Sequence, residues 1–225
     1  MYKYEMHSHS VPSTGGCDIR AHIDSLIKKG FSGMVITNHF ISGGTAVDRS
    51  LPWESFVDVY RQDYLYGLEY AKKLDFDLLF GLEEHVGGGR EILLYGITPD
   101  LIEAHPELKM ASAEKYAEVV HEAGGLVYQA HPYRARDYIA NPTPLECIHA
   151  LDGIEVFNAT NEPLWNKQAE RFAEEHGLSC VAGSDAHGIG TGGFGGIDTN
   201  ERIRNNDDLV RILKSGNYRI IKDTV

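Results

Sequence analysis

The chain is short of cysteine, of long apolar runs and of basic residues, and each shortage excludes a class of protein. Its three cysteines, Cys17, Cys147 and Cys180, have no CxxC spacing, which argues against a disulfide framework and a cysteine-type zinc site. No segment approaches the roughly 20 apolar residues of a membrane span. The N-terminal MYKYEMHSHS also lacks the apolar region of a signal peptide. We therefore expect a cytoplasmic protein that makes no contact with membranes.

Acidic residues outnumber basic ones. The chain has 33 Asp and Glu against 21 Lys and Arg, which gives a net charge of −12 over 225 residues. Nonspecific binding to nucleic acid requires a basic surface, so we expect no nucleic-acid partner and disfavour a 3′–5′ exonuclease. Hydrophobic residues make up 42% of the chain, enough for a full core. Because the chain contains no linker, repeat or low-complexity segment, we predict one domain over residues 1–225.

Strand-like and helix-like segments alternate along the chain. Short apolar runs at 32–37 and 76–86 predict buried strands, and the capped segments 18–29 and 52–73 predict helices. Such alternation is typical of a parallel sheet. About seven strand–helix units predict an α/β fold, a distorted (β/α)7 TIM-like barrel, with an open doubly wound sheet as the alternative. The glycine-rich loop 188–196 lacks a GxGxxG context, so we expect a flexible rim and not a nucleotide site.

Side chains of the metal-ligand type stand where several predicted strands end. These residues are His7, His9, His39, Glu83, His131, Asp185 and His187. The carboxyl ends of barrel strands share one mouth, so we expect the side chains to meet there. Asp18 and Glu91 extend the candidate set. A catalytic zinc takes three protein ligands, so a set this large indicates two or three divalent ions, and mixed imidazole and carboxylate ligands fit Zn, Mn or Fe.

Taken in order, these segments resemble the PHP (polymerase and histidinol phosphatase) family. The matching segments are EMHSH, Asp18, TNH ending at His39, GLE ending at Glu83, AHPYR from His131, and GSDAH ending at His187. The resemblance implies a distorted (βα)7 barrel, usually with a trinuclear metal centre, and the hydrolysis of phosphoesters. By position, it assigns the first metal to His7, His9, Glu83 and Asp185, the second to Glu83, Glu91 and His131, and the third to Asp18, His39 and His187.

The chain departs from the family pattern at several positions. Glu5 stands where the family often has Asp, and Asn38 stands where T-D-H is usual. Glu91 replaces a residue that is commonly His, which lowers the charge of the second site and can change its metal preference. The loop between His9 and Asp18 is long, which makes Asp18 the least secure ligand.

The expected reaction is hydrolysis of a small phosphomonoester by direct attack of a metal-bound hydroxide. Asp185 and His187 are the predicted catalytic side chains, with His187 as a possible proton donor to the leaving oxygen. Arg134 and Arg20 are the predicted phosphate-binding residues, because a guanidinium fork suits phosphate oxygens. Only short loops, such as 10–17, 42–51 and 132–143, remain to select the substrate. We therefore expect the partner to be a small phosphorylated metabolite.

Two other classes of protein share part of this pattern. An amidohydrolase that cleaves C–N or C–O bonds would also have an HxH pair, a barrel and a late Asp. A non-catalytic metal-binding module would have the ligands without the reaction. The GxE segment and the DxH pair favour the phosphoesterase.

Overall fold

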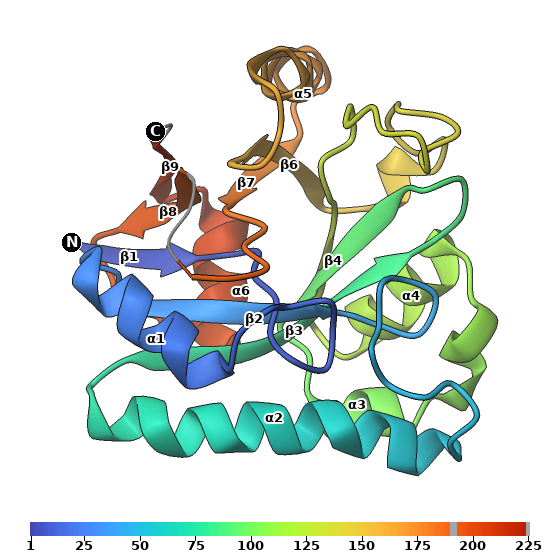
Figure 1. The fold of residues 1–225 in the computed structure, drawn as a ribbon. Helices are drawn as coiled ribbons and strands as arrows, with labels where there is room; N and C mark the ends of the chain where they lie inside the picture. Colours follow the sequence, from blue (N-terminus) through green and yellow to red (C-terminus); the bar gives the residue numbers. More distant parts are fainter. Residues whose placement is uncertain (190–192, 224–225) are drawn as a thin grey trace.

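The computed structural model describes residues 1–189 and 193–223, and every strand within those residues joins one sheet. The sheet order is β7-β6-β5-β4-β3-β2-β1-β8-β9 (Figure 1). The strands are β1 (Tyr2–Glu5), β2 (Gly33–His39), β3 (Asp77–His85), β4 (Glu91–Tyr95), β5 (Leu126–Gln129), β6 (Gly153–Asn158), β7 (Ser179–Gly183), β8 (Phe194–Thr199) and β9 (Tyr218–Asp223). The helices are α1 (Ile19–Lys28), α2 (Trp53–Lys73), α3 (Pro99–Glu103), η1 (Pro106–Met110), α4 (Ala113–Glu122), η2 (Ile148–Ala150), α5 (Pro163–His176) and α6 (Asn206–Ser215).

Strands β1 to β7 curl into a nearly closed barrel, which confirms the predicted fold class. The segments that follow β1 and β7 meet at one end of it. There the Asp185 N–H donates to the His7 carbonyl at 2.7 Å and the His9 N–H donates to the Ala186 carbonyl at 3.0 Å. Gly183 allows this approach, because a Cβ at that position would lie 2.2 Å from the His7 Cβ. The hairpin β8–β9 adds to the other side of β1 and raises the strand number above the expected seven.

The expectation of a wholly parallel sheet is wrong. Strand β4 runs antiparallel to both β3 and β5, and β8 runs antiparallel to β1 and β9. Glu91 therefore begins its strand where the other candidates follow or end theirs. Its register partner is His85, at the end of β3, so the reversed direction still brings Glu91 to the barrel mouth. The predicted loop 188–196 is also too long, since β8 begins at Phe194, and residues 190–192 of that loop lie outside the described residues.

Helix α2 shows why the chain folds locally as predicted. It begins after Pro52, a residue that cannot donate a backbone hydrogen bond. Its aromatic stripe faces the barrel, where the Phe56 and Tyr60 rings lie 5.5 and 5.4 Å from the Phe40 ring. Burial of each such side chain contributes about 1.5–3 kcal/mol. In Figure 1 this helix runs beneath β2 and β3 as one wall of the molecule.

Membrane-spanning length and apolar character do not occur together in any helix of the described residues.

Candidate metal centre

The barrel mouth brings together all the predicted metal ligands except Asp18. The residues that meet there are His7 and His9 after β1, His39 at the end of β2, Glu83 in β3, Glu91 at the start of β4, His131 after β5, and Asp185 and His187 after β7. All are buried except His39 and His187, which are partly exposed. Convergence of strand ends at one face thus holds for side chains that lie far apart in the sequence.

Glu83 occupies the centre of this cluster. Its Oε2 atom lies 3.2 Å from His7 Nε2 and 3.3 Å from His9 Nε2. The same oxygen lies 2.9 Å from His39 Nδ1. Its Oε1 atom faces the other way and lies 3.0 Å from His131 Nε2. One carboxylate therefore faces four imidazoles with two oxygens, which is the arrangement that a bridging ligand requires.

Three groups of residues define the candidate sites. Within each group, the ligand atoms all lie within 4.8 Å of one another. The groups are His7, His9, Glu83 and Asp185; His39, Glu83 and Glu91; and His9, His39 and His187. The first group is the set that the resemblance assigned to the first metal. The second contains His39 in place of the predicted His131, although His131 Nε2 lies 3.3 Å from Glu91 Oε2. In the third, His9 stands in place of the predicted Asp18.

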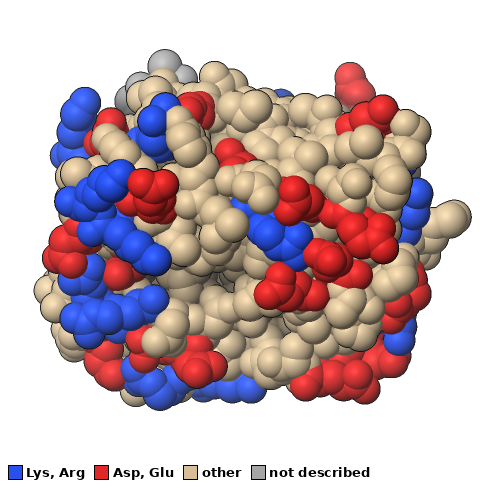
Figure 2. Space-filling model, turned by 90° about the horizontal axis from the view of Figure 1, so that it is seen from below, with Lys and Arg blue, Asp and Glu red and all other residues tan. Residues whose placement is uncertain are grey.

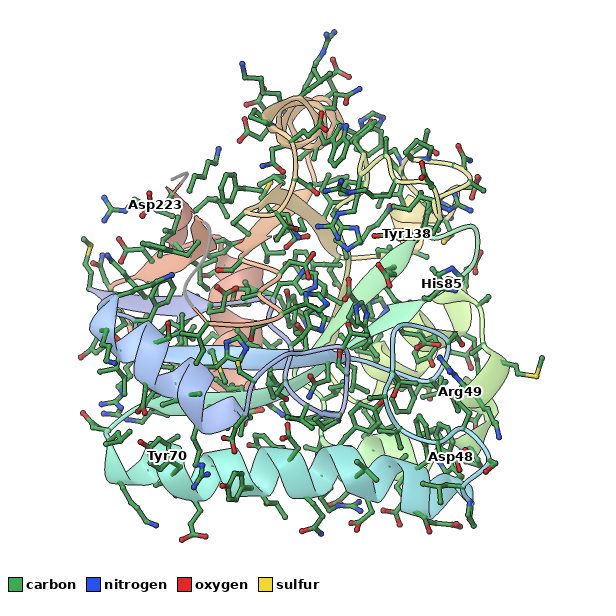
Figure 3. The ribbon with its side chains drawn as sticks, viewed as in Figure 1. Asp48, Arg49, Tyr70, His85, Tyr138 and Asp223 are labelled. Atoms are coloured by element: carbon green, nitrogen blue, oxygen red, sulfur yellow. The ribbon has the colours of Figure 1, made fainter. Side chains whose placement is uncertain are left out.

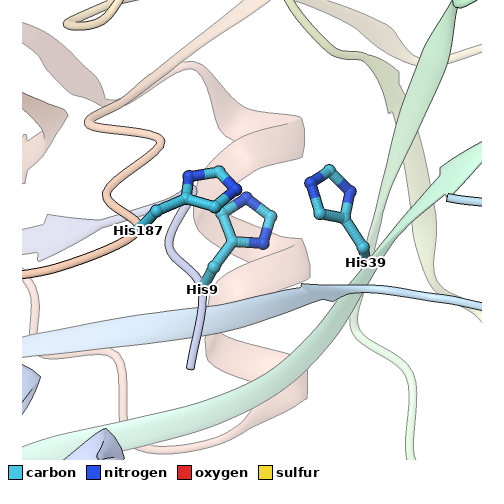
Figure 4. Close-up of side chains that lie close together, drawn as sticks. All are labelled: His9, His39 and His187. Atoms are coloured by element: carbon cyan, nitrogen blue, oxygen red, sulfur yellow. The ribbon is translucent and has the colours of Figure 1, made fainter. Parts of the chain in front are cut away.

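The third group consists of three imidazoles from separate segments (Figure 4). The His9 ring lies 4.3 Å from the His39 ring and 4.1 Å from the His187 ring, measured between centroids. Three histidines are a common protein ligand set for one zinc ion with an open position.

Unpaired buried atoms test whether these residues fit metal ions. His7 Nε2, His39 Nδ1 and Glu83 Oε2 are buried, and none makes a hydrogen bond within the described residues, although they lie close to one another. Buried polar atoms without partners cost free energy. Lone pairs directed into one shared space are what a divalent ion satisfies, and the mixed donor set suits Zn, Mn or Fe. The residues present therefore fit a metal cluster.

The two neighbouring carboxyl groups of the cluster, Glu83 and Glu91, have pKa values shifted in opposite directions. Burial would raise the pKa of Glu83, but His7 and His39 hold it well below its usual range. Burial and the adjacent Glu83 charge raise the pKa of Glu91 to about 8. Burial would lower the pKa of His39, but Glu83 and Glu91 raise it to about 9. Perturbed pKa values of this kind are concentrated at functional sites.

His187 is electrostatically different from the other imidazoles. Burial and the neighbouring His9 lower its pKa to about 4, so its ring is neutral at pH 7. A neutral imidazole is the form that binds metals. This state suits His187 as a metal ligand, and its role as a proton donor stays a prediction.

Glu155 is a site residue that the sequence analysis missed. Its Oε1 accepts a hydrogen bond from His7 Nδ1 at 3.0 Å, and its Oε2 accepts one from the His131 backbone N–H at 2.9 Å. The first contact fixes the His7 tautomer and directs Nε2 toward Glu83. The available signal was a glutamate between two apolar residues of the strand GIEVFN, because a charge there needs a buried partner.

Glu5 connects the first strand to the last barrel strand. Its carboxylate accepts hydrogen bonds from the backbone N–H groups of His7 at 2.9 Å and Ser184 at 2.8 Å, and also from the Ser184 hydroxyl. Burial raises its pKa to about 7 in spite of these donors. The residue that departs from the family's usual Asp thus holds both ligand-bearing segments.

Strained backbone occurs at two of the candidate ligands. His131 has φ 26° and Asp185 has φ 52°, both in the left-handed region that non-glycine residues rarely adopt. Such conformations cost about 1–3 kcal/mol each and persist where surrounding contacts over-determine them. The hydrogen bonds from the backbone N–H groups of His131 to Glu155 and of Asp185 to the His7 carbonyl supply such contacts.

The two predicted phosphate-binding arginines lie in different places. Arg134 is buried beside the cluster, where its Nη2 donates to Asp185 Oδ2 at 2.6 Å and to Thr160 Oγ1 at 2.7 Å. Arg20 is outside the cluster and pairs with Asp18 at 3.3 Å, the two side chains being 45% and 42% exposed. Asp18 caps α1 by accepting the Arg20 N–H at 2.8 Å, and it belongs to none of the three groups of ligand atoms. The geometry therefore does not support the expectations for Asp18 and Arg20.

Fold and site together define a barrel protein with a buried cluster of imidazoles and carboxylates that is able to bind metals. A family model described as PHP-associated matches residues 163–218, which include Asp185 and His187. No match was found among curated protein sequences.

Solved structures with the same fold carry different activities. A two-domain protein from Bacteroides vulgatus, containing a predicted PHP-like metal-dependent phosphoesterase, superposes with a TM-score of 0.72 at 16% identity. The match covers 99% of this chain and 65% of that one, so this chain spans about two thirds of that protein. An amidohydrolase from Chromobacterium violaceum with bound sulfate and no metal gives a TM-score of 0.64 at 18% identity, over 97% of each chain. A lesion-specific endonuclease from Pyrococcus furiosus gives 0.58 at 14% identity, over 97% of this chain and 57% of that one.

These matches confirm the predicted resemblance to the PHP family, whose fold this chain has. Because one fold supports several activities, the reaction has to be inferred from the site.

Proposed function

We propose that this chain is a metal-dependent phosphoesterase whose substrate is a small phosphomonoester. The observation that carries the proposal is the central Glu83 carboxylate, shared among four imidazoles, with unpaired buried atoms around it. We propose His7, His9, His39, Glu83, Glu91, His131, Asp185 and His187 as the ligands of two or three divalent ions.

Divalent ions held there would supply Lewis acidity, which activates water at neutral pH and offsets the charge of phosphoryl oxygens. The chain's own residues orient the site. Glu155 fixes the His7 ring, and Glu83 sets the spacing between the ligand groups. Arg134 places a buried positive charge next to Asp185, where a phosphoryl oxygen would be stabilised by a guanidinium fork.

Substrate size is inferred from the loops around the mouth. In the loop 42–51, Arg49, labelled in Figure 3, donates to the Ile41 and Gly43 carbonyls at 2.7 and 2.6 Å. This loop lies next to His39, because a Cβ at Gly44 would be 3.1 Å from the His39 ring. The loop 132–143 is fixed to the β3–β4 turn, since the Ala140 N–H donates to the Gly88 carbonyl at 3.0 Å. Short, tethered loops favour a small metabolite as the partner.

The surface charge supports a small substrate over a nucleic acid. On the face shown in Figure 2, Lys and Arg gather toward one side among acidic residues, and Asp and Glu dominate the other side. With a net charge of −12, the chain as a whole offers weak attraction to a polyanion.

Metal analysis followed by a phosphate-release assay tests the proposal. Purified protein loaded with Zn²⁺, Mn²⁺ or Fe²⁺ is given p-nitrophenyl phosphate and a panel of phosphorylated metabolites. We expect metal-dependent turnover, lowered more than about 100-fold by Glu83→Gln, because loss of a ligand should exceed the 10–100-fold cost of losing its supporting partners. Glu84→Gln is the matched control, since Glu84 is equally buried on the same strand but accepts from the Ser42 N–H outside the cluster.

Other outcomes would identify a different reaction. Turnover restricted to lactams or esters would assign the chain to the amidohydrolases. Cleavage restricted to bis-p-nitrophenyl phosphate or lesion-containing DNA would assign it to the nucleases. Full metal occupancy without any turnover would leave a metal-binding module. The cytoplasmic location stays a prediction that cell fractionation would test.

A further inference from the structure

Helix α2 carries one carboxylate among its aromatic core residues. Asp63 lies between Tyr60 and Tyr64 and is partly buried. Its Oδ2 accepts a hydrogen bond from the Ser10 hydroxyl at 2.6 Å and lies 3.4 Å from Asn38 Nδ2. Neither contact belongs to the metal cluster or to the aromatic core, so the position of this carboxylate needs its own explanation.

Ser10 and Asn38 are bonded to each other as well as to Asp63. Asn38 Oδ1 accepts the Ser10 backbone N–H at 2.6 Å, and Asn38 Nδ2 donates to Ser10 Oγ at 2.8 Å. The serine hydroxyl has a single proton, and we assign it to Asp63 because that contact, at 2.6 Å, is shorter than the 3.2 Å contact with Asn38 Oδ1. The three side chains form a closed hydrogen-bonded group that joins the segment after β1, the end of β2 and helix α2.

This group is adjacent in sequence to two candidate ligands. Ser10 follows His9, and Asn38 precedes His39. The centroids of the His9 and His39 rings are 4.3 Å apart. His9 Nε2 lies 3.3 Å and His39 Nδ1 lies 2.9 Å from Glu83 Oε2. The same helix holds the second segment again, because the Tyr60 hydroxyl donates to the His39 carbonyl at 2.9 Å.

We infer that Asp63 is a positioning residue that acts through Ser10 and Asn38 to hold His9 and His39 at the separation required for a shared metal ion. This inference rests on the proposed metal centre. It assigns helix α2, which supplies none of the candidate ligands, a part in forming the site.

The chemistry of position 38 supports this role. An aspartate there would place a second carboxylate within about 3.4 Å of Asp63, in a partly buried space. Like charges so close disfavour ionisation of both groups. The amide of Asn38 instead donates toward the carboxylate, so Asn38 and Asp63 form a complementary pair. This pairing also gives a physical reason for asparagine where the resemblance leads one to expect aspartate.

A charge exchange between the two positions tests the inference. The variants are Asp63→Ala, Asn38→Asp and the double exchange Asn38→Asp with Asp63→Asn. Zn²⁺ affinity is measured by competitive titration, stoichiometry by elemental analysis, and ligand geometry by the visible absorption of the Co²⁺-loaded protein. We expect Asp63→Ala and Asn38→Asp to weaken at least one metal site by about 10–100-fold, as loss of a ligand-orienting group does.

The double exchange should recover the affinity to within about threefold, because the pair again has one carboxylate and one amide. Glu69→Ala, an exposed position on the same helix, is the control and should leave both affinity and spectrum unchanged. Unaltered metal affinity and Co²⁺ spectrum in Asp63→Ala, or equal loss in the single and double Asn38 variants, would overturn the inference. This test is independent of the proposed reaction. A protein that binds metal but releases no phosphate would contradict the phosphoesterase activity, and its metal affinity could still be compared among these variants.

Discussion

Individual side chains at the barrel mouth depend on partners that sequence motifs do not reveal. HxH and DxH spacing identified His7, His9, Asp185 and His187, because alternation along a strand puts such pairs on one face. Glu155 was missed, since its role comes from a contact with a residue 148 positions away in the chain. Asp18 caps α1 and lies outside the three groups of ligand atoms, so its role as a metal ligand stays a prediction.

Replacement of Glu155 by glutamine tests the importance of the His7 orientation. Glutamine keeps one acceptor oxygen but presents an amide donor to the other partner, so it cannot accept from both His7 Nδ1 and the His131 N–H. We expect Glu155→Gln to weaken Zn²⁺ binding by about 10–100-fold, measured by competition with a chromogenic chelator. The exposed Glu174→Gln on α5 is the control, and equal affinities in the two variants would contradict the assigned role.

The protonation of Glu91 and His39 predicts opposite pH trends for metal affinity and for the stability of the metal-free protein. Both groups have pKa values raised in the folded protein, to about 8 and about 9. A group whose pKa is higher in the folded than in the unfolded protein stabilises the fold at pH values below its unfolded pKa. This stabilisation is lost as the pH rises through its folded pKa. The metal-free protein should therefore lose stability between about pH 6.5 and 9, while metal affinity rises, because ions displace these protons.

Urea unfolding in chelator at pH 6.5 and 9, with metal titration at the same pH values, measures both trends. Each unit of pKa difference corresponds to about 1.4 kcal/mol. Glu91→Gln should flatten the stability profile in part, since it removes one of the groups whose pKa is raised by folding. A metal-free protein that becomes more stable toward pH 9 would refute the assignment.

At the level of secondary structure, strand positions were predicted better than strand directions. The apolar runs of β2, β3 and β6 stand out in the sequence, but an apolar run has no direction. Gly87, Gly88 and Gly89, which have φ values of 110°, 64° and 80°, make the β3–β4 connection a short hairpin and reverse β4. A short glycine-containing connection between two strands is a known hairpin signal, and it was the available evidence against a wholly parallel sheet.

The reversal of β4 brings Glu91 to the cluster, where a substitution can test its role as a ligand. Glu91→His would restore the residue that the family commonly has at a position whose backbone already faces the mouth. We expect the variant to shift preference from Mn²⁺ toward Zn²⁺, because imidazole is a softer ligand than carboxylate. The ratio of Mn²⁺ to Zn²⁺ dissociation constants, compared between this variant and the original protein, measures the shift. An unchanged ratio would indicate that Glu91 does not contact the metal.

At the level of the whole molecule, the candidate ligands connect the two ends of the barrel. His7 and His9 follow the first strand, and Asp185 and His187 follow the seventh. Ions held by both pairs would therefore link β1 to β7, in addition to the backbone bonds that His7 and His9 make with Asp185 and Ala186. One sheet that contains both β1 and β9 supports the proposal that residues 1–225 form one domain. The sequence predicted this closure from ligand position alone, without the hairpin β8–β9 that covers the other side of β1.

Metal removal should therefore lower the stability of the entire chain in a single step. An ion that binds only the folded state stabilises it by about 2.7 kcal/mol at 100 times its dissociation constant. We expect thermal unfolding to remain one transition that moves to lower temperature after chelation and returns after Zn²⁺ is added, followed by circular dichroism and by tryptophan fluorescence. The double variant His7→Ala with Asp185→Ala should show a smaller Zn²⁺-dependent rise in unfolding temperature than the original protein, because it removes two of the four residues in the first ligand group. Two separate transitions, only one of them sensitive to metal, would show that the N-terminal and C-terminal strands do not unfold as one unit.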